Sequence, residues 1–311
     1  LENNTIGLGK KKDCQNRSVV TTPTEIVKYM VDKTLSKVCE GKTPSEILDI
    51  SVADIACGSG IFLEEAFACL QDYCVQWYIC NGQTDHLIET GIDLYKLPLQ
   101  EKKDILCSCI YGIDIDIHAV EVAKFSLLIK LIEDETAPSV SEVVPILPDL
   151  GDNIQFGNSL VSQTELNGIS GANHQMMEIA PFDWSTINNG CGFDVIIGNP
   201  PYVNTEGMHA LLPSAEVEIY KKKYKTSHKQ FDKYFIFIEQ AINKINENGL
   251  VCYIVPNKFF KIGAGEKLRN LIAKERMLVS LDDFGDAQLF EDKTIYSSII
   301  LLSKAKQTSF V

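Results

Sequence analysis

The chain has 311 residues, of which 45% are apolar, so it can bury one large α/β core. No apolar run approaches the roughly 18–20 residues of a membrane-spanning helix, and the polar N-terminus lacks a signal-peptide pattern, so we expect a cytoplasmic protein. The net charge of −13 argues against an extensive phosphate-binding surface, an objection that the basic run over residues 221–229 partly offsets.

The cysteines and histidines show no metal-binding pattern. None of the ten cysteines forms a C-x-x-C pair, and the five histidines do not fall at zinc spacing. We expect reduced thiols that serve mainly as small buried apolar side chains, and no metal site.

The N-terminal region predicts an arm followed by a helix. Residues 1–17 are polar and are expected to form the arm. A helix should then run to about Val38, because Thr22 can cap it, Pro23 suits the first helical position and Glu25 lies three residues after the cap.

Further along the chain, strand patterns alternate with helix patterns. Strands are expected at Ile47–Ala56, Ile110–Asp114, Ile154–Gly157, Phe193–Ile197, Leu250–Val255, Met277–Asp282 and Tyr296–Leu302. Helices are expected at Ile61–Cys80, Leu97–Cys107, Ile117–Glu133, Phe231–Asn246 and Gly265–Glu275, whereas residues 134–192 are otherwise irregular. This alternation predicts an α/β fold with a doubly wound, mostly parallel sheet.

A glycine-rich loop, DIACGSG, follows the first predicted strand and precedes a helix. Gly58 and Gly60 allow a tight turn and a close approach to a ligand. Asp54 falls at the carboxyl end of the strand, where its charge suits a cationic, amine-bearing cofactor, and Ala56 and Cys57 complete the loop. The spacing suits S-adenosylmethionine better than a dinucleotide, although an ordinary strand–turn–helix corner is the alternative.

The second strand ends in YGIDID. Asp114 can accept hydrogen bonds from both ribose hydroxyls of a cofactor, with Ile115 beside it, whereas we favour Asp116 as a helix cap. The acidic residue comes 54 positions after Gly60, which implies a helical insertion over about residues 68–108. Asn158, after the third strand, is a weaker candidate for the cofactor's adenine edge, because such residues are common in turns.

The segment FDVIIGNPPYV carries the chemistry. The side chain of Asn199 and the carbonyl of Pro200 can each accept one N–H of an aromatic amine, which frees its lone pair for methyl transfer. Pro201 helps to fix the backbone, and Tyr202 offers a flat face for a base flipped out of duplex DNA.

Together these motifs resemble the gamma class of amino-group DNA methyltransferases, and in particular the methylase parts of type IIG and type I restriction-modification enzymes. The resemblance covers about residues 18–303. It implies that Thr22 closes over the methionine end of the cofactor and that Phe237 contacts its adenine. It also implies that Phe290 stacks on the flipped adenine and that Lys293 lies near the DNA. Core packing is the alternative for both phenylalanines.

The sequence departs from the family pattern at three points. Ile55 replaces a commoner proline, and Asn158 replaces a commoner aspartate, which puts the adenine contact in doubt. Nothing beyond the last strands can serve as a target-recognition domain. We therefore expect residues 18–311 to be one catalytic domain that relies on a specificity subunit or a C-terminal recognition domain for most phosphate contacts.

The resemblance predicts transfer of a methyl group from S-adenosylmethionine to the N6 of adenine in double-stranded DNA, within a restriction-modification system. Two alternatives remain. One is methylation of protein glutamine or RNA, since an amide nitrogen is also conjugated. The other is a scaffold subunit without activity, which the intact Asn-Pro-Pro-Tyr segment argues against.

Overall fold

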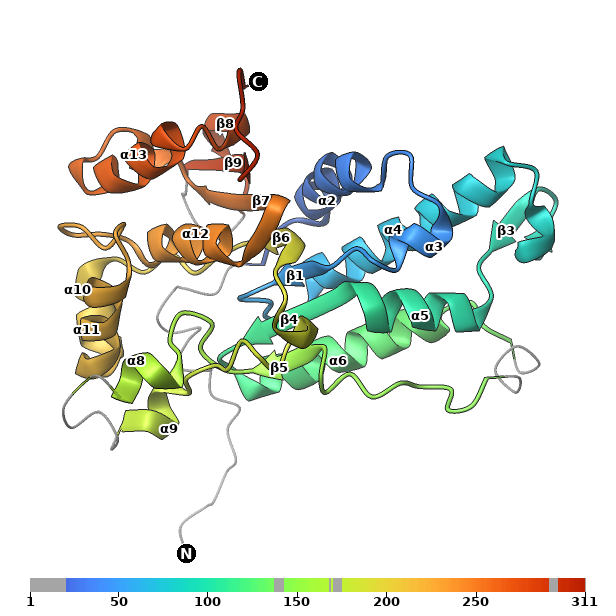
Figure 1. The fold of residues 1–311 in the computed structure, drawn as a ribbon, viewed down its shortest axis with the longest axis horizontal. Coiled ribbons are helices and arrows are strands. Elements are labelled where there is room, and N and C mark those ends of the chain that lie inside the picture. The colour runs from blue at the N-terminus through green and yellow to red at the C-terminus, as the bar shows by residue number, and fades with distance from the viewer. Residues whose placement is uncertain (1–20, 137–142, 168, 170–174, 291–295, 311) are drawn as a thin grey trace, which may run out of the picture.

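The computed structural model describes residues 21–136, 143–167, 169, 175–290 and 296–310. Its centre is a seven-stranded sheet with the order β5-β4-β1-β6-β7-β9-β8 (Figure 1). The strands are β1 Val52–Asp54, β4 Ile110–Asp114, β5 Ile154–Phe156, β6 Phe193–Gly198, β7 Ile245–Pro256, β8 Leu278–Gln288 and β9 Tyr296–Ser303.

The direction of the strands brings the predicted motifs to one edge. β5, β4, β1, β6 and β7 run parallel to one another, whereas β9 is antiparallel to both β7 and β8. Because parallel strands share a carboxyl edge, the segments after β1, β4, β5 and β6 meet there. The predicted α/β class with a mostly parallel sheet is confirmed.

Helices cover both faces of the sheet. On one face α2, α4, α5 and α6 pack together, and on the other lie α12 and α13 (Figure 1). Their bounds are α2 Thr24–Cys39, α4 Ile61–Cys80, α5 Leu99–Cys109, α6 Ile117–Ile132, α12 Lys233–Lys244 and α13 Glu266–Lys274. No helix in the described ranges has the length and apolar character needed to cross a bilayer.

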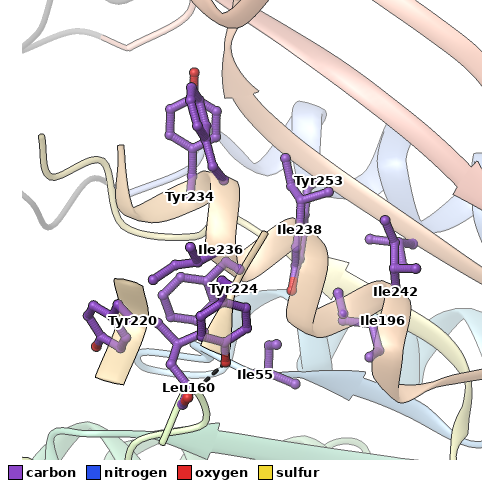
Figure 2. Packing of buried hydrophobic residues seen from close by; sticks show 14 of the residues in the cluster. Ile55, Leu160, Ile196, Tyr220, Tyr224, Tyr234, Ile236, Ile238, Ile242 and Tyr253 are labelled. Carbon is purple, nitrogen blue, oxygen red and sulfur yellow. Dashed lines mark hydrogen bonds between the residues drawn. The ribbon is translucent and has the colours of Figure 1, made fainter. Parts of the chain in front are cut away.

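Helix α12 is the most deeply buried helix of its face. Residues 233–242 are all buried, and the buried polar side chains among them, Lys233, Glu239 and Gln240, each have a protein partner. Figure 2 shows Ile238 and Ile242 of α12 near Ile196 of β6 and Tyr253 of β7. This packing fixes α12 against the sheet next to the carboxyl edge.

The structure differs from the predicted strand Ile47–Ala56. Residues Pro44–Ile47 form a short helix, α3, and β1 spans only Val52–Asp54. Thr43 accepts a hydrogen bond from the Glu46 N–H, and the Glu46 side chain accepts one from the Thr43 N–H. This capping box, with proline at the first helical position, outweighs the β propensity of the isoleucines.

Two insertions lie between strands of the seven-stranded sheet, one between β1 and β4 and one between β6 and β7. Within the predicted insertion, η1 Thr84–His86 and the β2–β3 hairpin (Ile88–Gly91, Leu94–Lys96) precede α5. After β6, the chain forms two helices that the sequence analysis did not predict, α10 Thr205–Leu211 and α11 Ser214–Lys223. The shorter elements are α8 Gln163–Asn167, α9 Met176–Ile179, η3 Asn188–Gly190, η4 Asn257–Phe260 and η5 Gly263–Gly265.

At the opposite edge, one carboxylate joins the beginnings of three strands. Asp194 Oδ2 accepts hydrogen bonds from the backbone N–H and the hydroxyl of Ser51, both at 2.9 Å. Its Oδ1 accepts one from Asn246 Nδ2 at 2.8 Å. Asp194 therefore links β6 to the segment before β1 and to the start of β7.

We expect Asp194→Ala to lower the free energy of unfolding by about 1–3 kcal/mol, because it leaves part-buried donors without an acceptor. Urea denaturation measures this change. Asp183→Ala is the matched control: Asp183 also accepts two bonds from one serine, Ser185, but in an exposed local turn. Equal losses for the two variants would contradict the proposed link between strands.

Candidate active site

The glycine loop has the conformation that its sequence predicts. Gly58 and Gly60 have φ values of +53° and +91°, which side chains other than glycine rarely adopt. A Cβ on Gly60 would also lie 3.1 Å from the Cβ of Ala123 in α6. The Cys57 N–H donates to the Ile113 carbonyl at 3.0 Å, so the loop is bonded to β4.

Asp114 holds this loop against the end of β4. Its Oδ2 accepts a hydrogen bond from the Gly58 N–H and its Oδ1 accepts one from the Asp116 N–H, both at 2.8 Å. Asp116 in turn caps α6 by accepting from the His118 N–H, which confirms the predicted cap. Ile115, between them, is 44% exposed. The ribose role of Asp114 stays a prediction.

Asp54 is a buried carboxyl group with few hydrogen-bond donors to stabilise its charged form. It is 2% exposed, and its Oδ1 accepts one hydrogen bond, from the Ala56 N–H at 3.0 Å. Burial raises the pKa of Asp54 to about 8, and the negative charge of Asp114 adds to this shift. A cationic ligand would compensate the ionised form, as the sequence analysis predicts.

Gly198 makes room for this carboxyl group. A Cβ at position 198 would lie 2.6 Å from Asp54 Oδ1, closer than atoms can pack. The glycine that ends β6 therefore lets the carboxyl group at the end of β1 reach the start of the Asn-Pro-Pro-Tyr segment.

Asn199 presents an acceptor that nothing in the described structure uses. Its Nδ2 donates to Thr22 Oγ1 at 3.1 Å, whereas its Oδ1 is buried and has no hydrogen-bond partner among the described residues. A buried acceptor left without a donor is costly, so its presence at this edge needs an explanation, and a ligand N–H would provide one. The bond to Thr22 orients the amide so that Oδ1 faces away from it.

The predicted capping role of Thr22 is wrong. The N-cap of α2 is Pro23, without a side-chain hydrogen bond, and the Thr22 side chain is buried against Asn199 instead. A threonine before Pro-x-Glu has the local sequence of a cap, but a partner 177 residues away takes its hydroxyl group.

Tyr202 is held rigidly beside the prolines. Its hydroxyl group donates to the Ile254 carbonyl at 2.9 Å, and its ring meets that of Tyr234 edge to face at 5.9 Å. Burial raises the pKa of Tyr202, so the hydroxyl group stays protonated. Pro200 is buried and Pro201 partly exposed. The arrangement suits a ring that stacks on a nucleobase rather than a side chain that accepts a proton.

Asn158, at the predicted adenine position, is buried, and each end of its side-chain amide makes one hydrogen bond. Its Nδ2 donates to Glu216 Oε1 at 2.9 Å, and its Oδ1 accepts from the Leu160 N–H at 3.1 Å. Glu216 lies on α11, which the sequence analysis missed. The segment SAEVEIYKKK reads as a solvated helix, and only tertiary packing shows that Glu216 is 1% exposed.

The remaining predicted residues are spread over the structure. Phe237 is buried in α12, on the face of the sheet that Tyr202 also packs against. Phe290 is 3% exposed and packs with the cluster on the other face. The structure therefore places Tyr202 and Phe290 in different clusters, and the stacking role of Phe290 stays a prediction. Lys293 lies outside the described residues.

The basic run offers less positive surface than the sequence suggests. Lys222 pairs with Glu218 at 2.6 Å, and Lys223 pairs with Glu165 at 2.9 Å. These partners compensate much of the charge that was expected to offset the acidic composition. The described part of the chain also contains no cluster of side chains suited to a metal ion.

Comparison with known proteins identifies the family of this chain. The profile of the Eco57I restriction-modification methylases matches residues 108–290, which is more than half of the chain. The matched region begins just before β4 and ends just after β8. The chain belongs to the Eco57I restriction-modification methylase family. The resemblance read from the motifs is thereby confirmed.

Relatives of this Eco57I-type methylase are longer proteins. The type II restriction enzyme and methyltransferase RM.Eco57I of Escherichia coli is 44% identical over 96% of the chain, which spans 29% of that relative. The type II methyltransferase M.PaeR7I of Pseudomonas aeruginosa is 31% identical over 36% of the chain and 19% of its own length. The chain thus covers under a third of these two proteins.

A solved structure confirms the fold of the Eco57I-type methylase. A putative class I S-adenosylmethionine-dependent methyltransferase from Listeria monocytogenes has a TM-score of 0.53 at 16% identity, covering 98% of this chain and 67% of its own.

We expect Asp54→Asn to stabilise the ligand-free Eco57I-type methylase by about 1–3 kcal/mol at pH 8, by removing a buried uncompensated carboxyl group. In the folded state Asp54 keeps its proton up to about pH 8, but when unfolded it loses the proton near its usual value of 3.8. The stability of the parent should therefore fall as the pH rises through that window.

Thermal unfolding between pH 4 and 9 tests this. The Asp54→Asn substitution should reduce the decline, whereas Asp85→Asn, at an exposed aspartate on η1, should leave it unchanged. A parent whose stability rises with pH over the same window would contradict the assignment.

Proposed function

We propose that this chain is the methyl-transfer part of a restriction-modification enzyme. It transfers a methyl group from S-adenosylmethionine to the N6 of an adenine flipped out of double-stranded DNA. The observation that carries the proposal is the buried Oδ1 of Asn199 at the carboxyl edge of the sheet, which has no hydrogen-bond partner among the described residues.

Asn199 provides what a conjugated amine needs from the protein. Its Oδ1 can accept one N–H of the amine and the Pro200 carbonyl the other, so that the nitrogen moves toward tetrahedral geometry. Thr22 keeps the amide from rotating, because it binds Nδ2. Tyr202 supports one face of the base, held by its bond to the Ile254 carbonyl.

The carboxyl edge also fits the proposed methyl donor. Asp54 would face its positively charged amine, Gly58 and Gly60 leave the backbone open, and Asp114 would accept from its ribose hydroxyls. When bound, the donor supplies a methyl group: N6 forms the new C–N bond, the C–S bond breaks with its electron pair on sulfur, and N6 loses a proton to water. The residues named here position the reactants, and none of them removes the proton from N6.

DNA recognition requires contacts beyond this chain. The composition is acidic, and three of the basic side chains in the 221–229 run are paired with glutamates. A recognition domain or a specificity subunit would supply most phosphate contacts. We expect the isolated chain to bind DNA weakly, and nanomolar sequence-specific binding by it would contradict this division of labour.

Transfer of labelled methyl from S-adenosylmethionine by the full-length protein tests the proposal. Unmethylated duplex DNA, RNA and a glutamine peptide are offered in parallel, and the products are identified. N6-methyladenine in DNA supports the proposal. Label found only in RNA or only in the peptide would show that the substrate is not DNA. Cofactor binding without transfer to any substrate would favour a scaffold.

We expect Asn199→Ala to lower methyl transfer by at least about 10²–10³-fold, the usual cost of losing one such polar contact to the reacting group. Binding of S-adenosylmethionine should change little, which isothermal titration calorimetry can verify. Asn204→Ala is the control, since Asn204 caps α10 only five residues away. Wild-type turnover in the Asn199 variant would refute the mechanism.

A further inference from the structure

We propose that Glu216, on helix α11, is the acceptor that recognises the amino group of the cofactor's adenine. Asn158, at the end of β5, positions it rather than touching the adenine itself. This inference rests on the proposed use of S-adenosylmethionine. It assigns recognition of the adenine amino group to a residue of α11, a helix that contains none of the motifs found in the sequence.

The first step is that both ends of the Asn158 amide already have protein partners. An acidic or amide side chain at the end of the third strand could bind an adenine edge through an oxygen. Here that oxygen already accepts from the Leu160 N–H, and the amide nitrogen is turned toward Glu216. Asn158 therefore presents a donor to Glu216, and its own oxygen is turned into the backbone loop.

The second step concerns the two oxygens of Glu216. Oε1 accepts two hydrogen bonds, from Asn158 Nδ2 at 2.9 Å and from the hydroxyl group of Tyr220, and it forms an ion pair with Lys233 Nζ at 3.9 Å. No hydrogen bond from a described residue engages Oε2. One oxygen is thus fixed, and the other is free to accept.

The third step places Glu216 beside the predicted adenosine end of the site. Asn158 follows β5, which pairs with β4 so that Asp114 lies opposite Phe156. Lys233 links the two groups, because it approaches Glu216 and its positive charge also acts on Asp114. Phe237, predicted to contact the adenine, lies one helical turn after Lys233 on α12.

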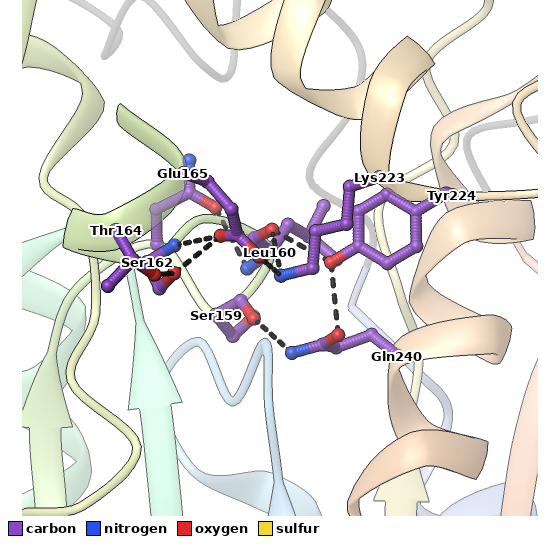
Figure 3. A network of polar contacts seen from close by, with 9 residues as sticks. Ser159, Leu160, Ser162, Thr164, Glu165, Lys223, Tyr224 and Gln240 are labelled. Carbon is purple, nitrogen blue, oxygen red and sulfur yellow. Dashed lines mark hydrogen bonds and ion pairs between the residues drawn. The ribbon is translucent and has the colours of Figure 1, made fainter. Parts of the chain in front are cut away.

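The cluster is also rigid enough to define a contact. The loop after Asn158 is bonded to α11 and α12, since the Leu160 carbonyl accepts from Lys223 Nζ at 3.0 Å and lies 2.7 Å from the Tyr224 hydroxyl group (Figure 3). Gln240 Nε2 donates to the Ser159 carbonyl at 2.8 Å. Lys233 lies over the Tyr220 ring, 5.6 Å from its centroid.

Glu216→Gln tests the assignment, because it reverses the polarity of one atom. Asn158 Nδ2 and Lys233 Nζ carry only donors, so they favour an oxygen at the position of Oε1, and the glutamine then places its NH₂ group at the position of Oε2. That group would oppose the adenine amine but could donate to a 6-oxo purine. The probes are S-adenosylhomocysteine and S-inosylhomocysteine, with dissociation constants measured by calorimetry.

We expect the wild type to prefer the adenosyl ligand by about tenfold or more, the equivalent of one hydrogen bond to a charged acceptor. Glu216→Gln should lose or reverse this preference. Glu218→Gln, at an exposed position of the same helix, should keep it.

Each outcome bears on a different claim. A wild type that binds neither ligand would refute the use of the cofactor, and with it the proposed function. A wild type that binds both equally would overturn the role of Glu216 without any variant. Tight binding with an unchanged adenosyl preference in Glu216→Gln would do the same while leaving the proposed function intact.

Discussion

The hydrogen bond from Asn199 Nδ2 to Thr22 Oγ1 fixes the side chain on which the proposed chemistry depends. An amide has two ends of similar shape, and the wrong end would present donors to an amine. By binding the nitrogen, Thr22 leaves the oxygen as the group that faces the site. The segment before the first helix thus decides the polarity of a group at the end of the fourth strand of the parallel set.

The parallel sheet makes this meeting possible. Residues 22, 54, 114, 158 and 199 are far apart in the sequence, yet their strands or flanking segments end at one edge. The cost of bringing them together includes polar groups buried with few partners, such as the carboxyl group of Asp54. Stability therefore comes from elsewhere, including the packing of α12 and the Asp194 link at the opposite edge.

Much of this could be predicted from local sequence. The Gly58 and Gly60 loop, the cap at Asp116 and the position of Asn199 after β6 all follow from patterns of a few residues. Two of the failures have a common physical cause. Thr22 looks like a cap and Glu216 looks like a solvated residue, and in both cases a partner distant in the sequence decides the role. Local patterns cannot encode such pairings.

The buried carboxyl group of Asp54 also couples ligand capture to proton release. Burial raises its pKa to about 8, so near neutral pH the ligand-free protein holds a proton at this position. A cationic ligand favours the ionised form and would expel that proton to the solvent. The heat of binding then includes the ionisation heat of whichever buffer takes the proton up. Two laboratories working in different buffers would record different enthalpies for one and the same affinity.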